Sequence, residues 1–262
     1  MKPLRISILT QNDIVAIPNN IYRLILDDEI EVVSVFTISG KGDVKIMLFR
    51  FILGFGIFQM LKLSYNFFLL HFKDFSYLIF RSFLNLRPIS IKSICKEENI
   101  FFKHNVNLSS KKIISYLESK KIDVLVSFST PIKLDKELLN TAKHGGINLH
   151  CSLLPKYSGL LPSFWTQYFK EKKIGCTIHQ MDKNIDTGKI LGQEEIDNSI
   201  ENSIFENIIL TKKMGGVLMN KVLRNIQTNN VLQLNQEGVR SYFSWPSIKQ
   251  IKEFKKSGGR LI

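Results

Sequence analysis

A short apolar run at residues 122–128, Ile-Asp-Val-Leu-Val-Ser-Phe, constrains the fold of this chain most strongly. Continuous apolar runs of this length are typical of parallel strands that are buried on both faces of a sheet. Strand-like and helix-like patterns alternate around it. We assign further strands to residues 4–9, 30–37, 100–103, 147–150, 175–181 and 189–196, and helices to residues 17–26, 109–120, 136–143 and 203–226.

This alternation predicts an α/β fold, with a Rossmann-like open, twisted, mostly parallel sheet that carries helices on both faces. The length of 262 residues is sufficient for a sizeable core. We expect residues 1–228 to form one domain. Residues 229–262 have a weaker pattern and are expected to form a short C-terminal extension.

Residues 46–87 interrupt the alternation and hold ten of the 19 phenylalanines. The longest uncharged run in this segment, residues 51–61, is shorter than the ~18–20 residues that a membrane-spanning helix needs. We therefore expect an apolar helical insertion at residues 44–90 rather than a membrane anchor. The favoured interpretation is extra core helices or an oligomer contact, such as a homodimer. Contact with a membrane surface is the alternative.

The formal net charge of +13 raises the question of an acidic partner. Residues 45–92 carry seven cations against Asp74 alone, a net charge of +6 in the most apolar part of the chain. A second cluster of cations lies near the C-terminus, at Lys249, Lys252, Lys255, Lys256 and Arg260. Basic and apolar residues together favour an anionic membrane surface over nucleic acid, and the chain has no known RNA-reading motif.

The three cysteines, Cys95, Cys151 and Cys176, have unrelated spacings that indicate neither a disulfide framework nor a zinc site. The N-terminus reads as a first strand rather than as a signal sequence. We therefore expect a cytoplasmic protein, with peripheral contact at the inner face of the membrane as the alternative left open by residues 46–87.

The residues most informative about function are Asn148 and His150, within the strand expected at 147–150. Residues two apart on a strand project to the same side, so this amide and this imidazole can converge on one reacting atom while Leu149 points into the core. The segments Gly-Cys-Thr-Ile-His at 175–179 and Asp-Thr-Gly at 186–188 follow. An amide, an imidazole and a loop carboxylate are suited to acyl chemistry.

In these segments the chain resembles the folate-dependent formyltransferases, a family that includes glycinamide ribonucleotide, methionyl-tRNA and sugar N-formyltransferases. The matching pieces are residues 148–159, 175–179 and 186–190, in this order. The resemblance implies transfer of a formyl group from 10-formyltetrahydrofolate to an amine, without a metal. It assigns the catalytic roles to Asn148, His150 and Asp186.

The chemistry explains why these residue types are needed. An amine that attacks a formamide carbonyl creates a negatively charged oxygen, and the attacking nitrogen must lose a proton. Asn148 can donate a hydrogen bond to that oxygen, which is typically worth roughly 2.7–4 kcal/mol. His150 can donate to the same oxygen or take the proton of the amine. Asp186 can orient His150 and favour its cationic form.

The resemblance also implies a folate cleft between two loops, in which the first loop binds the pterin ring through backbone groups. The expected folate-binding residues are Phe128, Ser129, Thr130, Pro131, Ile132, Met181, Asp182 and Ile185. The expected acceptor-binding residues are Ser152, Lys156, Tyr157, Gly159 and Trp245. For His179, support of the site and a plain core position remain equally open.

The acceptor does not follow from the motifs. Only the long helix and a short tail follow residue 196, whereas methionyl-tRNA formyltransferases carry a sizeable C-terminal domain for tRNA. We therefore expect a small amine acceptor, an amino sugar linked to a nucleotide or a lipid carrier, as in the sugar N-formyltransferases of surface-polysaccharide assembly. A methionyl-tRNA formyltransferase-like enzyme and a non-catalytic folate-binding relative are the alternatives.

Overall fold

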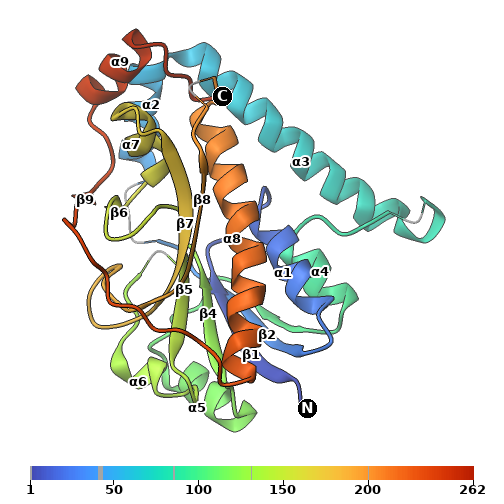
Figure 1. Cartoon of the computed structure of the whole chain (residues 1–262). Helices are drawn as coiled ribbons and strands as arrows, with labels where there is room; N and C mark the ends of the chain where they lie inside the picture. The colour runs from blue at the N-terminus through green and yellow to red at the C-terminus, as the bar shows by residue number, and fades with distance from the viewer. Residues whose placement is uncertain (1, 41–43, 85, 131, 200) are drawn as a thin grey trace.

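The computed structural model describes residues 2–40, 44–84, 86–130, 132–199 and 201–262. A seven-stranded sheet forms its centre, in the order β3-β2-β1-β4-β5-β7-β8 (Figure 1). The strands are β1 (Leu4–Thr10), β2 (Ile30–Thr37), β3 (Phe101–Lys103), β4 (Val124–Phe128), β5 (Gly146–His150), β7 (Lys173–Gln180) and β8 (Ile190–Asp197). The first five run parallel, whereas β7 and β8 are antiparallel to their neighbours. The prediction of a mostly parallel, Rossmann-like sheet is confirmed.

Helices cover both faces of the sheet, as expected. On one face, α1 (Ile17–Ile25), α4 (Ile91–Glu97) and α8 (Ile204–Gln227) bury their apolar sides against the strands. On the other face, α5 (Lys111–Lys120) and α6 (Lys136–Leu139) enclose a second apolar cluster. Strand β4, at the centre of the sheet, is buried on both sides, and this burial explains its continuous apolar run.

The helix expected at residues 136–143 is wrong in its length. Helix α6 ends at Leu139, because the next residues turn toward the start of β4. The backbone N–H groups of Lys143 and His144 donate to the carbonyls of Ile122 and Asp123 instead of continuing a helix. Pairing with a strand distant in sequence has overridden the local helical pattern.

The apolar insertion forms two helices that pack partly on the body. Helix α2 (Val44–Phe55) and helix α3 (Ile57–Leu84) contribute to a third cluster of buried side chains. This cluster also holds α7 (Pro162–Tyr168) and α9 (Ile248–Lys256), which the sequence patterns did not predict. Phe51 and Phe55 of α2 and Met60 of α3 are buried in this cluster, whereas other apolar side chains of both helices are exposed. Within the described ranges, no helix is both long and apolar enough to cross a membrane.

The C-terminal extension packs back onto the domain. Leu234 pairs with Ile190 at the start of β8, and β9 (Tyr242–Phe243) pairs with β6 (Ser158–Gly159). Helix α9 then lies against α2 (Figure 1). It begins with a capping box in which Ser247 and Gln250 satisfy each other's backbone N–H groups. Residues far apart in the sequence therefore enclose the third cluster together.

The packing of α9 can be tested by one buried substitution. Ile251 is 0% exposed, between α9 and α2, so Ile251→Ala should lower the free energy of unfolding by about 2–5 kcal/mol. Urea unfolding measures this change. The exposed neighbour Lys252 is the control, and Lys252→Ala should change stability by less than about 0.5 kcal/mol. Equal stabilities for the two variants would contradict the packing of α9 on the core.

Candidate active site

Strand β5 presents Asn148 and His150 on one side of the sheet, as its spacing predicts. The alternate residues Ile147 and Leu149 are buried in the cluster beneath α8. Strand β5 lies between β4 and β7, so its side chains meet residues from both neighbours. In register, Asn148 is flanked by Ser127 of β4 and His179 of β7.

The Asp186 carboxylate reaches these side chains from the loop that follows β7. Its Oδ2 atom lies 3.6 Å from Nδ1 of His150, and its Oδ1 atom lies 3.5 Å from Nε2 of His179. The backbone N–H of Gly159 donates to Oδ2 at 2.9 Å. The structure thus brings all three expected catalytic side chains together and adds a second histidine.

The amide of Asn148 is fixed at both ends. Ser127 Oγ donates to its Oδ1 atom at 2.6 Å, and its Nδ2 atom lies 3.2 Å from Nε2 of His179. The amide nitrogen has two hydrogens, so one remains for another acceptor. His179 Nδ1 donates to the Gln180 carbonyl at 2.8 Å, which leaves Nε2 facing Asn148 and Asp186. His179 therefore belongs to the site rather than to a plain core position.

Sequence reasoning missed the part played by Ser127 in holding Asn148. The position of Ser127 could have indicated this contact. Ser127 is a polar residue in the otherwise apolar run of β4, and its register partner on β5 is Asn148. A polar residue buried in a strand needs a hydrogen-bond partner, and the nearest candidates lie directly across the neighbouring strand.

His150 is held in one tautomer. Its Nε2 atom lies 2.8 Å from the Tyr157 carbonyl, which can only accept, so Nε2 carries the hydrogen and Nδ1 faces Asp186. Burial lowers the pKa of His150, while the charge of Asp186 raises it, and the net direction is down. The neutral ring therefore presents an unprotonated Nδ1 atom near neutral pH, beside a carboxylate that can offset a proton arriving there.

Asp186 is charged in this setting. Burial would raise its pKa, but His150, His179 and the Gly159 N–H outweigh burial and lower the pKa from 3.8 to about 2. Because the folded state favours the ionised form, this carboxylate contributes to stability above pH 3.8, and the contribution is lost as the pH falls toward 2.

Three residues of the expected site have a left-handed backbone conformation. The φ angles of Ser129, Tyr157 and Asp186 are +56°, +59° and +54°. Such conformations cost on the order of 1–3 kcal/mol for a residue with a side chain and persist only where surrounding contacts impose them. These three positions lie in the three loops that surround β5.

The C-terminal extension supplies much of that constraint. Gln236 Nε2 donates to the carbonyls of Asp186 and Gly188, at 3.0 and 2.9 Å. On the other loop, Ser241 Oγ accepts from the Tyr157 N–H at 2.9 Å. A Cβ atom at Gly159 would overlap the Phe243 carbonyl, and the φ of +95° at Gly159 also favours glycine. The extension thus fixes both loops that meet at His150.

The first expected folate loop follows β4, at the point where the strand order reverses between β1 and β4. Open α/β sheets bind ligands at such switch points. Ser129 and Thr130 are half-buried there, and Thr130 Oγ1 donates to the Leu9 carbonyl at 3.0 Å. The Phe128 side chain lies in the core at 1% exposure. Pro131 falls outside the described residues.

The second expected folate loop lies beside the first. Met181 and Ile132 pack against the same apolar cluster. Met181 and Asp182 also line a hollow of about 340 Å³, together with His144 and Gly146 at the start of β5. Ile185 has an exposed side chain, and its carbonyl accepts from Arg240 at 2.7 Å.

The expected acceptor-binding residues differ in how far their side chains are exposed. Ser152 and Tyr157 are buried and hold the loop after β5: Ser152 Oγ donates to the Lys156 carbonyl at 2.9 Å, and the Tyr157 hydroxyl donates to Glu171 at 2.7 Å. Lys156 is exposed, with its Nζ atom 3.9 Å from Glu171. Trp245 is half-buried against Phe51 of α2.

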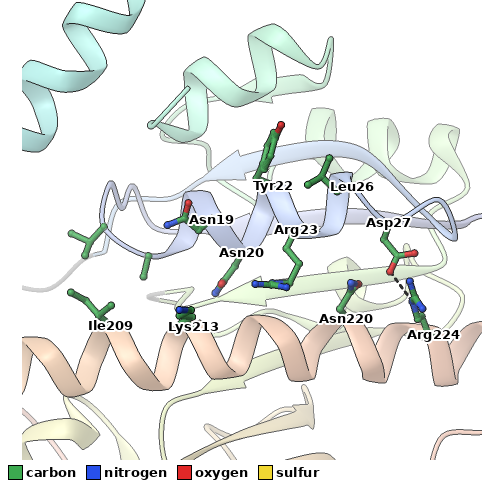
Figure 2. A pocket seen from close by; sticks show the side chains of 12 residues that line it. Asn19, Asn20, Tyr22, Arg23, Leu26, Asp27, Ile209, Lys213, Asn220 and Arg224 are labelled. Atoms are coloured by element: carbon green, nitrogen blue, oxygen red, sulfur yellow. Dashed lines mark hydrogen bonds and ion pairs between the residues drawn. The ribbon is translucent and has the colours of Figure 1, made fainter. Parts of the chain in front are cut away.

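A separate hollow of about 500 Å³ lies between α1 and α8 (Figure 2). Its walls include Asn19, Arg23, Lys213 and Asn220, together with Arg224, which forms an ion pair with Asp27 at 2.8 Å. None of the expected site residues lines it. Among the described residues, no group of three or more His, Cys, Asp or Glu side chains is arranged to hold a metal ion.

Comparison with known proteins agrees with this fold. Residues 86–208 match the family model described as "Formyl transferase". Over 140 residues the chain is 36% identical to the bifunctional polymyxin resistance protein ArnA of Wigglesworthia glossinidia brevipalpis, covering 50% of this chain and 21% of that protein. It is 29% identical over 161 residues to methionyl-tRNA formyltransferase of Alkaliphilus oremlandii, covering 62% of this chain and 51% of the relative.

Among solved structures, an N-formyltransferase from Helicobacter canadensis, in complex with folinic acid and dTDP-3-aminofucose, superposes with a TM-score of 0.60. The match has 17% sequence identity and covers 96% of this chain and 79% of that one, which shows a shared fold. The fold is α/β, and its side-chain cluster joins an amide, two imidazoles and a carboxylate. Over residues 86–208, which hold Asn148, His150 and Asp186, the chain is similar to the formyl transferase family.

The pKa of His150 provides a test of the cluster. Removing the charge with Asp186→Asn should lower the pKa of His150 further, because the carboxylate opposes the effect of burial. NMR titration of the imidazole resonances measures this shift. His144, whose pKa is set by its own burial, Lys143 and Asp123, is the control within the same spectra and should not move. A rise in the pKa of His150 in the variant would contradict the assignment.

The contacts of Gln236 provide a second test. Gln236→Ala removes two hydrogen bonds to the loop of Asp186 and should lower the free energy of unfolding by about 1–3 kcal/mol. Chemical denaturation measures the change. Gln233, an exposed residue of the same segment, is the matched control, and Gln233→Ala should have little effect. If both variants are equally stable, the extension does not hold the loop.

Proposed function

We propose that this protein transfers a formyl group from 10-formyltetrahydrofolate to the primary amine of an amino sugar carried by a nucleotide. The observation that carries the proposal is one cluster in which His150 and His179 lie beside the Asp186 carboxylate and Asn148 lies beside His179, at the distances given above. It matches the requirements of formyl transfer: a donor for the developing oxygen anion and an acceptor for the proton of the amine.

Each side chain has a role in this proposal. The free hydrogen on Nδ2 of Asn148 donates to the formyl oxygen as charge develops there, and Ser127 and His179 hold the amide still. His150 takes the proton of the amine at Nδ1, and the ionised Asp186 stabilises the resulting imidazolium. His150 can then give this proton to the folate nitrogen as the bond between that nitrogen and the formyl carbon breaks. Tyr157 holds the ring through its carbonyl, so the proton has a single destination.

The residues that surround the site are compatible with a folate. Half-buried polar groups at Ser129 and Thr130 lie at the strand-order switch point, where a flat polar ring can bind. Across from them, Met181 offers apolar contact and Asp182 offers a carboxylate beside a hollow of about 340 Å³. When bound, the folate supplies the formyl carbonyl, while the residues of this chain supply its orientation and the proton transfers.

The choice of an amino sugar rests on two observations. The Helicobacter canadensis structure, which shares this fold over 96% of the chain, is described with dTDP-3-aminofucose. In addition, the cationic Lys156 and the carboxylate of Glu171 stand at the loop after β5, where they can bind a nucleotide-linked amine. A methionyl-tRNA acceptor is the second candidate, favoured by the likeness to the Alkaliphilus oremlandii enzyme.

The reaction is tested by measuring tetrahydrofolate release from 10-formyltetrahydrofolate, with a panel of nucleotide-linked amino sugars and with charged initiator tRNA. We expect turnover with one of the sugars. Asn148→Ala should reduce kcat by about 10²–10³-fold, the usual effect of losing one oxyanion donor. His150→Ala should abolish turnover, whereas His71→Ala, at an exposed histidine outside the site, should retain it.

The other outcomes separate the alternatives. Turnover with tRNA alone would assign the acceptor to the second candidate. Binding of folinic acid without transfer to any amine, unchanged in Asn148→Ala, would show a non-catalytic folate-binding protein and contradict the proposal. A sugar attached to a lipid carrier belongs in the same panel, because the motifs leave the group that carries the amine open.

A further inference from the structure

Helix α3 has two apolar stripes, and only one of them is covered. The stripe toward the body comprises Met60, Leu63, Phe67, Leu70 and Tyr77, and it includes Tyr77 at 1% exposure. The opposite stripe is exposed and follows the same alternation of three and four residues. It consists of Phe58, Leu61, Tyr65, Phe68, Phe72, Phe75 and Ile79. We call this second stripe the outer face of α3.

The outer face is long, continuous and aromatic. Helix α3 has 28 residues, which corresponds to about 42 Å at 1.5 Å per residue. Figure 1 shows it along the edge of the molecule, leading away from α2 and α9. Phe58, Phe68 and Phe72 are 84%, 62% and 57% exposed. A long exposed apolar stripe of this kind is typical of a surface that contacts another molecule or a membrane.

Cations surround this face. Lys62 and Lys73 follow Leu61 and Phe72 directly, so they border the stripe, and both are exposed. Asp74 is the acidic residue of α3, and it is occupied on the opposite side, where its Oδ1 atom accepts from Ser90 and Ser93. Lys62 and Lys73 therefore lie along the border of the outer face, and Glu206 of α8 lies near Lys62.

The fold adds the second cationic cluster of the sequence to the same region. Helix α9 packs against α2, next to the start of α3, and its Lys255 Nζ atom donates to the Phe55 carbonyl at 2.9 Å. The side chains of Lys249, Lys252 and Lys256 on α9 are exposed. The fold thus brings the C-terminal cluster next to the start of α3, although the two segments are more than 150 residues apart in the sequence.

We propose that the outer face of α3 docks on an anionic phospholipid surface, with the helix lying in the plane of the membrane. Aromatic side chains enter the headgroup boundary, and the lysines beside them contact phosphate groups. A second copy of the chain fits less well, because pairing two outer faces would place the lysines of one copy near those of the other. The anionic surface supplies the opposite charge.

Flotation of the full chain with vesicles tests the proposal. We expect binding to vesicles of phosphatidylcholine with phosphatidylglycerol, much weaker binding to phosphatidylcholine alone, and loss of binding as salt is added. The double variant Phe68→Ser, Phe72→Ser should reduce the partition coefficient at least about tenfold. Both residues are exposed, so the melting temperature should be unchanged.

Matched variants separate the apolar and the charged contributions. Leu232→Ser with Val239→Ser changes two exposed apolar residues of the C-terminal extension and should leave binding intact. Lys62→Glu with Lys73→Glu should abolish the preference for anionic vesicles, whereas Lys111→Glu with Lys112→Glu, on α5 beyond the sheet, should not.

Two results would overturn the proposal. The first is an absence of vesicle binding in the wild type. The second is a dimer in analytical ultracentrifugation that the Phe68→Ser, Phe72→Ser variant dissociates, with no effect of that variant on vesicle binding. The membrane proposal does not depend on Asp186 or on the side chains around it. A failure of membrane binding would therefore leave the proposed formyl transfer unaffected, and a failure of formyl transfer would leave the membrane proposal unaffected.

Discussion

The buried carboxylate of Asp186 is the interaction on which the site depends. Two imidazoles lie 3.5 and 3.6 Å from it, and one backbone N–H donates to it at 2.9 Å. Burial alone would make the charge costly, and these partners reverse that cost and lower the pKa to about 2. The carbonyls of Tyr157 and Gln180 fix the orientations of the two rings. The charge of Asp186 can then stabilise a proton that arrives at Nδ1 of His150.

The rest of the fold serves to place this carboxylate. Strand β5 carries Asn148 and His150, β7 carries His179, and β4 carries Ser127. Three adjacent strands of the sheet therefore hold the side chains that surround Asp186. Asp186 is on a loop, and its left-handed backbone has to be held from outside the sheet. Gln236 of the C-terminal extension does this through two carbonyls. The extension therefore matters to the candidate site, although it contains none of the three side chains that are proposed to be catalytic.

The sequence predicted what depends on local patterns. The period of two in β5 places Asn148 and His150 together, and continuous apolar runs indicate parallel strands, so both were foreseen. Contacts between distant segments were not: Ser241 meets Tyr157 across 84 residues, and Gln236 meets Asp186 across 50. No local period encodes such pairs. The phenylalanine-rich insertion was visible in composition, but only packing shows which side of α3 is covered.

A double-mutant cycle between His150 and Asp186, followed by the rate of formyl transfer in single turnovers, tests the central claim most directly. If Asp186 acts through His150, then His150→Ala, Asp186→Asn and the double variant should lose similar amounts of activity, because the second change removes a group that no longer has a partner. Losses that multiply in the double variant would show that the two residues act independently. That result would contradict a site organised around one carboxylate.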